Sequence, residues 1–109
     1  MAIVYKVLGQ SNPAATTATT LYTVPASTST VVSTVVVCNQ SATTDSFRIA
    51  IRPAGASLLA KHYIAYDNAI AANDSVTLTI GITLATTDVV TIYAGTANLS
   101  FNMFGSEIT

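Results

Sequence analysis

Apolar and polar residues alternate with a period of two in several segments of the chain. One Phe and two Ile residues alternate with polar or small residues between positions 46 and 52, and the pattern recurs at 75–80 and 98–103. Successive side chains of a β-strand point to opposite faces, so this period indicates strands with one buried face. Other segments are rich in β-branched and aromatic residues, which favour strands. The predicted strands are 3–8, 21–24, 30–38, 46–52, 61–66, 75–84, 88–93 and 98–103.

Turn signals separate the predicted strands. Asn39-Gln40-Ser41, Pro53-Ala54-Gly55 and Gly95-Thr96 contain residues that favour chain reversal. About eight short strands with turns between them predict an all-β fold. We expect a single antiparallel β-sandwich, jelly-roll or Ig-like, that spans residues 1–109. Residues 10–20 are polar, small and interrupted by a proline, and we expect them to form a loop or an extended arm.

The segment 30–38 departs from clean alternation, because it is apolar on both faces. Its sequence is Thr-Val-Val-Ser-Thr-Val-Val-Val-Cys. A strand with one wet face should carry polar residues there, so this strand is either covered on both sides within one subunit or in contact with another subunit. In a two-layer sandwich the second option is the more natural. Val31, Val35 and Val37 are therefore predicted to lie together at a subunit interface.

The composition also favours assembly. Threonine accounts for 18 of 109 residues, whereas only four basic and five acidic residues are present. Charged residues make up 8% of the chain, far below the roughly one quarter of an ordinary soluble domain. Either Thr, Ser and Asn provide the solvation alone, or much of the surface is covered by other subunits. We favour the second interpretation and expect a homo-oligomer.

Several classes of function find no support in the sequence. The net charge of −1 gives no electrostatic footprint for nucleic acid or for an anionic membrane. No apolar stretch approaches the roughly 18 residues of a membrane span. The first residues lack the basic and long apolar regions of a secretory signal, so we expect the chain to be made in a cytoplasm.

The chain also offers little material for catalysis, and we expect no enzyme, cofactor or metal site. His62 is the only imidazole and is expected to be exposed or at an interface, since no second ligand or nucleophile accompanies it. Cys38 has no partner for a disulfide and is expected to act as a small buried apolar residue. Asp74 and Asp88 each precede a strand, where Asp commonly stabilises turns.

Arg48 and Arg52 are the most informative charges. They alternate with apolar residues on one strand and are predicted to lie on its outward face. They are either solvated charges or partners of acidic groups on a neighbouring subunit or a larger partner. Tyr63 and Tyr66 on the next predicted strand could extend the same surface, because Tyr and Arg are enriched at interfaces.

Several strings of residues occur together in an order that is typical of one family. The strings are Leu21-Tyr22-Thr23-Val24-Pro25-Ala26, Val31 to Asn39, Phe47 to Gly55, Leu78 to Leu84, Asp88-Val89-Val90 and Phe104 to Ile108. This order resembles the small β-sandwich structural proteins of tailed bacteriophage virions. In those proteins a Tyr-x-Val-Pro-Ala opening leads to a Val-x-x-Cys/Thr-Asn strand and a Leu-x-x-x-Asp strand pair. This chain has Thr87-Asp88 where Gly-Asp is often found.

The resemblance implies a virion protein made in the host cytoplasm. Its most specific implication is a capsid decoration, or cement, protein that binds the major capsid protein or other virion proteins, as a homo-oligomer expected to be a trimer. The first strand and residues 10–20 are then the expected lattice contact. The alternative is a tail, neck or fibre component, including a receptor- or carbohydrate-binding module. Most Tyr and Phe residues fall on predicted strands and Trp is absent, which favours a decoration protein over such a binding module.

Overall fold

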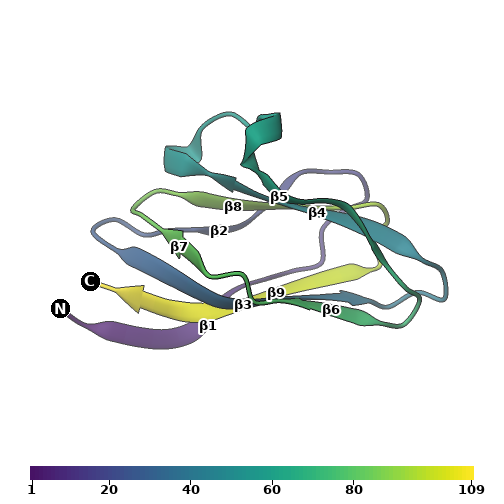
Figure 1. Ribbon diagram of the computed structural model, residues 1–109, viewed down its shortest axis with the longest axis horizontal. Coiled ribbons are helices and arrows are strands. Elements are labelled where there is room, and N and C mark those ends of the chain that lie inside the picture. The colour runs from purple at the N-terminus through teal and green to yellow at the C-terminus, as the bar shows by residue number, and fades with distance from the viewer.

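The computed structural model describes residues 1–109 and confirms the predicted all-β sandwich. Two antiparallel sheets pack face to face, and the chain contains no α-helix (Figure 1). The elements are β1 (Ile3–Ser11), β2 (Thr19–Thr23), β3 (Ser29–Asn39), β4 (Asp45–Arg52), the 3-10 turns η1 (Pro53–Gly55) and η2 (Ala60–His62), β5 (Tyr63–Ile70), β6 (Ser75–Leu78), β7 (Ile82–Leu84), β8 (Val89–Ala94) and β9 (Leu99–Ile108). None of the helical turns has the length and apolar character that a membrane crossing requires.

The order of the strands identifies the sandwich as a jelly roll. One sheet has the order β1-β9-β3-β6, with β7 also paired to β3, and the other has the order β2-β8-β4-β5. If β6 and β7 are counted as one interrupted strand, the pairs are β1 with β9, β2 with β8, β3 with β6 and β7, and β4 with β5. These nested pairs belong alternately to one sheet and to the other, which is the jelly-roll pattern found in viral capsid and lectin domains.

The core lies between the sheets and follows the predicted alternation. Phe47 and Ile49 on β4 and Leu99, Phe101 and Met103 on β9 are completely buried. The rings of Phe47 and Phe101 meet edge to face, with their centroids 6.2 Å apart, and so join the two sheets at the centre. Burial of each such side chain stabilises the fold by roughly 1.5–3 kcal/mol on transfer scales.

A β-bulge in β3 changes which residues face the core. The pairing of β3 with β9 shifts register between Val32 and Thr34. Val32 faces the core before the bulge, and Val35 and Val37 face it afterwards, with 1% and 0% of their surfaces exposed. Val31 precedes the bulge and is 39% exposed on the other face. The prediction that Val31, Val35 and Val37 share one interface is therefore wrong, because one extra residue reverses the facing of all later side chains.

For residues 10–20, predicted as a loop or an extended arm, the structure shows a loop with narrower bounds. Strand β1 continues to Ser11 and β2 begins at Thr19, so only residues 12–18 form the connection. This connection is attached to the sandwich. The Asn12 side-chain amide donates hydrogen bonds to the carbonyl oxygens of Ala97 and Leu99, at 2.9 and 2.6 Å. A loop held by the β8–β9 turn is a fixed part of the domain rather than a free arm.

Candidate interaction surfaces

The polar side chains that could suggest chemistry are occupied in local structure. His62 is buried within the subunit, whereas an exposed or interface position was expected, and its Nδ1 accepts a hydrogen bond from the Leu59 backbone at 3.0 Å. The predicted turn role of Asp88 is confirmed, since its carboxylate accepts backbone N–H bonds from Ala54 and Ala85, both at 2.9 Å. No three His, Cys, Asp or Glu side chains converge in a way that could hold a metal ion.

The first surface is the outer face of the sheet formed by β1, β9, β3, β6 and β7. Cross-strand partners in an antiparallel sheet project from the same face. The register joins Ile3 to Ile108, Tyr5 to Ser106 and Val7 to Phe104, and β3 continues these rows with Ser29, Val31 and Thr34. At one end this face is dominated by apolar residues, which we call the apolar corner: Ile3, Tyr5, Val7, Val31, Phe104 and Ile108.

No charged side chain lies on this outer face. Lys6 and Glu107 belong to β1 and β9 but alternate with the outward rows, so they face the interior side, where they form an ion pair of 3.2 Å. The other charged residues lie on β4, β5 or the connections between strands. Tyr5 is 84% exposed, and Ile3 and Val7 are each 47% exposed. We call this outer surface the uncharged face.

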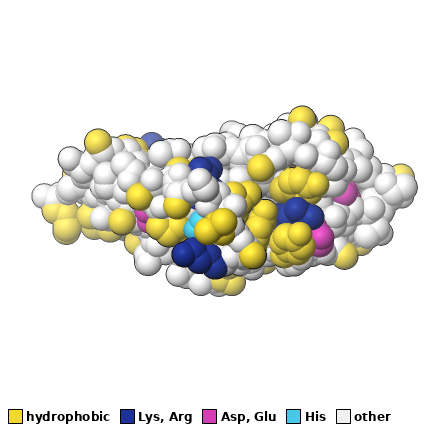
Figure 2. Space-filling model, turned by 90° about the horizontal axis from the view of Figure 1, so that it is seen from above, with side chains coloured by type: hydrophobic (Ala, Val, Ile, Leu, Met, Phe, Trp, Pro, Cys, Tyr) yellow, Lys and Arg dark blue, Asp and Glu magenta, His cyan; other side chains and the backbone are white.

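The second surface lies on the outer side of the four-stranded sheet. Arg48 and Arg52 occupy its outward positions on β4, opposite the buried Phe47 and Ile49, as the alternation predicts. Figure 2 shows this side, where basic and acidic side chains lie among apolar ones. The two sides of the sandwich therefore differ in character, since one carries charges and the other carries none.

Arg48 is held by partners from its own subunit. Its guanidinium Nε lies 2.6 Å from the Asp67 carboxylate, and this hydrogen bond raises the pKa of Arg48 further above its ordinary value. The guanidinium carbon also lies 4.2 Å from the ring centroid of Tyr66 and 4.3 Å from that of Tyr93. Tyr63 packs edge to face against Tyr66. We call Arg48, Tyr63, Tyr66, Asp67 and Tyr93 the tyrosine–arginine patch.

Arg52 stabilises the turn that follows β4. Its guanidinium donates hydrogen bonds to the carbonyl oxygens of Gly55 and Ala56 at 3.0 and 2.7 Å and to the Thr91 hydroxyl at 3.3 Å. Both arginines thus have partners within the subunit, which the sequence could not reveal because Asp67 and Thr91 are distant in the chain. A contact of either arginine with another subunit stays a prediction.

An apolar depression adjoins the tyrosine–arginine patch. Its volume is about 610 Å³, and it is lined by Leu58, Leu59, Ala60, Tyr63 and Tyr66. The η1–η2 connection forms one side and the start of β5 forms the other. Tyr63, which was predicted as a contact residue, therefore belongs both to the patch and to the wall of this depression.

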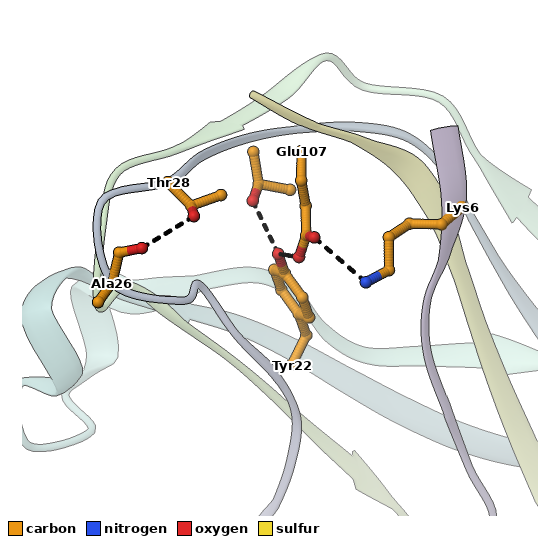
Figure 3. A network of polar contacts seen from close by, with 6 residues as sticks. Lys6, Tyr22, Ala26, Thr28 and Glu107 are labelled. Carbon is orange, nitrogen blue, oxygen red and sulfur yellow. Dashed lines mark hydrogen bonds and ion pairs between the residues drawn. The ribbon is translucent and has the colours of Figure 1, made fainter. Parts of the chain in front are cut away.

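A polar network links the two sheets near the chain ends (Figure 3). The Tyr22 hydroxyl donates to the Glu107 carboxylate at 2.5 Å and lies 2.8 Å from the Thr30 hydroxyl. Burial, together with the bond to Glu107, raises the pKa of Tyr22 to about 12. The hydrogen bond from Tyr22, assisted by Lys6, lowers the pKa of Glu107 below its ordinary value. The network satisfies the polar groups of β1, β2, β3 and β9 where the sheets meet.

Comparisons with known proteins support the fold. No protein-family model matches the chain, and no curated protein matches it. The chain is similar in structure to a chain in the solved structure of infectious bursal disease virus, Gx strain, with a TM-score of 0.53 and 13% sequence identity. The similarity covers 97% of this chain and 30% of that chain. At this identity the likeness shows a shared β-sandwich fold over almost the whole domain.

Proposed function

We propose that this protein is a structural component of a virion and that it decorates the outer surface of a capsid as a homo-oligomer. The observation that carries the proposal is the uncharged face with its apolar corner. Large contiguous apolar patches are rare on soluble monomers, and where they occur they typically mark contacts with other molecules. The structural likeness to a chain of a virus and the sequence resemblance to phage virion proteins support a virion as the setting.

The proposed mechanism is passive. The apolar corner covers the junction between capsid subunits and removes apolar surface from water on both sides. Each well-buried side chain contributes roughly 1.5–3 kcal/mol before the entropy cost of association is subtracted. A regular shell repeats the same contact many times, and an oligomer that binds several sites at once gains avidity. No charged side chain of the uncharged face must be desolvated in this contact.

The test measures how many copies of the protein a particle carries and how one introduced charge changes its incorporation. In purified particles that carry this protein, we expect a copy number comparable with that of the major capsid protein. Val31→Asp places a carboxylate in the exposed apolar corner, and we expect about tenfold or more weaker incorporation, because burial of an unpaired charge costs more than about 1.4 kcal/mol. Quantitative mass spectrometry of particles measures both quantities.

Thr77→Asp provides the matched control. Thr77 is exposed on β6 and pairs with Val36, so it projects from the same face at the other end of the sheet. The control should incorporate like the wild-type protein. Equal incorporation of Val31→Asp and the wild type would remove the apolar corner from the mechanism, and a few copies per particle would favour a tail or neck position.

A second candidate function is receptor or carbohydrate binding by a tail module. The tyrosine–arginine patch favours it, because Tyr63 and Tyr66 offer aromatic surface beside an apolar depression. Tyr66 is more than half exposed and could stack on a sugar ring or hold a receptor side chain. Under this function, Tyr66→Ala should abolish binding of the protein to host cells, while Val31→Asp should leave it unchanged. Flow cytometry with labelled protein distinguishes the two outcomes.

A further inference from the structure

Strand β1 is an edge strand whose segment Ile3–Val7 lacks the usual protection, because its one register shift lies beyond this segment, between Val7 and Gly9. Within the chain it pairs only with β9. Its segment Ile3–Val7 keeps an unshifted register with β9, and four of its five residues are apolar and exposed. Natural edge strands are commonly shortened, bulged or charged, since an open strand edge can pair with another chain. Lys6 is the only charge in this segment, and it is neutralised by Glu107.

The other edges of the sandwich carry such protection. Strand β2 is five residues long and shifts register at Thr20–Tyr22, and β6 and β7 are four and three residues long. Strand β5 pairs irregularly with β4, and its Asp67 has a left-handed backbone with φ of 50°. By contrast, the Ile3–Val7 segment of β1 presents a regular and unprotected edge.

The hydrogen-bonding groups of this edge follow from the register. Ala2 and Thr109 exchange both backbone hydrogen bonds, at 3.0 and 2.9 Å. In an antiparallel pair, hydrogen-bonded and non-hydrogen-bonded residues alternate, so Val4 and Lys6 also point their backbone groups toward β9. The N–H and C=O groups of Ile3, Tyr5 and Val7 therefore point away from β9, toward the open edge.

We propose that two copies of this protein pair through antiparallel β1 strands, with a two-fold axis at Tyr5. In that register Tyr5 faces Tyr5 of the second copy, and Ile3 faces Val7. All three pairs are of the hydrogen-bonded type, so six backbone N–H groups find carbonyl partners. Val4 faces Lys6, whose aliphatic stem can cover it, and no like charges are opposed. The backbone groups and side chains of this segment are thus complementary to the same segment of a second molecule. We therefore take the partner of the open edge to be a second copy of this protein.

The pairing extends the five-stranded sheet across the two-fold axis and leaves its outer face free. Ile3, Tyr5 and Val7 of the two copies lie side by side, so the two apolar corners join into one larger surface. This inference goes beyond the proposed decoration of a capsid and does not depend on it. It predicts a dimer in place of the trimer that the family resemblance implies.

A charge exchange at position 5 tests the two-fold register. Tyr5→Lys and Tyr5→Glu each place like charges opposite one another, and each should weaken dimerisation about tenfold or more. An equimolar mixture of the two variants should restore the dimer, because position 5 faces itself across the axis. Sedimentation velocity from about 1 to 200 µM measures the effect, since one strand pair buries less than the standard interface of about 800 Å² per partner.

Val31→Lys and Val31→Glu are the matched controls. Val31 lies in the apolar corner but two strands away from the edge, so these variants should dimerise like the wild type. Far-ultraviolet circular dichroism confirms that each variant is folded. A wild-type protein that is monomeric or trimeric over the whole concentration range would overturn the proposal. A dimer that the Val31 variants disperse, or that the mixture does not restore, would also overturn it. Incorporation into particles is measured separately, so decoration and pairing can fail independently.

Discussion

At the scale of single residues, the few charges of this chain are used mainly to hold its own structure. Arg48 joins β4 to Asp67 on β5, and Glu107 on β9 receives a hydrogen bond from Tyr22 on the opposite sheet. A buried hydroxyl without a partner costs roughly 1–3 kcal/mol, so the Tyr22–Glu107 bond fixes how the sheets meet at this end. The pKa of Glu107 reports on that contact.

We predict that Glu107 makes the stability depend on acid pH. Its pKa is lower in the folded protein than the ordinary 4.5, so its stabilising effect is complete above about 4.5 and is lost as the pH falls through the folded value. Glu107→Gln should therefore reduce the free energy of unfolding by about 1 kcal/mol at pH 7, a modest loss because the site is partly exposed. The loss should be smaller at pH 3, because at that pH part of the stabilising effect of Glu107 is already gone in the wild type. Urea unfolding at both pH values measures the difference.

Tyr22→Phe is the control for this prediction. It removes the main cause of the lowered pKa, so the double variant with Glu107→Gln should be little less stable than either single variant. Strictly additive losses would show that the two groups do not act as a pair.

At alkaline pH, the raised pKa of Tyr22 implies a second loss of stability between about pH 10 and about pH 12 in the wild type.

At the scale of elements, the bulge in β3 decides the roles of its valines. Gly105 of β9 lies opposite Val32, and a Cβ atom there would collide with the Val31 carbonyl oxygen. The close approach of β3 and β9 at this point thus requires a residue without a side chain. Beyond the bulge, Val35 and Val37 enter the core, whereas Val31 stays on the uncharged face.

We predict that the same Val→Asp substitution strongly lowers the stability of the fold on one side of the bulge and hardly changes it on the other. Val35→Asp buries an unpaired carboxylate in the core and should cost at least about 4 kcal/mol, enough to unfold many small domains. Val31→Asp should keep the fold and change the free energy of unfolding by less than about 1 kcal/mol. Circular dichroism and chemical unfolding of the two variants check this register. A folded Val35→Asp together with an unfolded Val31→Asp would indicate that the strand is shifted by one residue.

At the scale of the whole molecule, the nested strand pairs separate charge from apolar surface. The sheet that contains β4 and β5 carries the tyrosine–arginine patch, while the outer face of the other sheet carries no charge. The same nesting brings β1 beside β9, so the two ends of the chain lie together at one end of the sandwich (Figure 1). The open edge of β1, the apolar corner and the Tyr22–Glu107 network are therefore neighbours.

Local pattern alone determined the all-β fold, the approximate strands and the core positions of Phe47 and Ile49. Each of these follows from a period-two alternation, which the geometry of a single strand imposes. The outward placement of Arg48 and Arg52 was predictable for the same reason. The sequence also indicated that few charges would cover the surface, because the number of charged residues is known without their positions.

Only the tertiary structure decided how the strands pair and which face each side chain of β3 takes. The bulge depends on β9, some 70 positions away, and no local signal marks the residue between Val32 and Thr34 as an extra one. His62 was expected to be exposed or at an interface, because the alternation does not reveal the 3-10 turn that brings the Leu59 backbone N–H to its ring. The uncharged face likewise exists because pairing in space, rather than order in sequence, brings the outward rows of β1, β9 and β3 together.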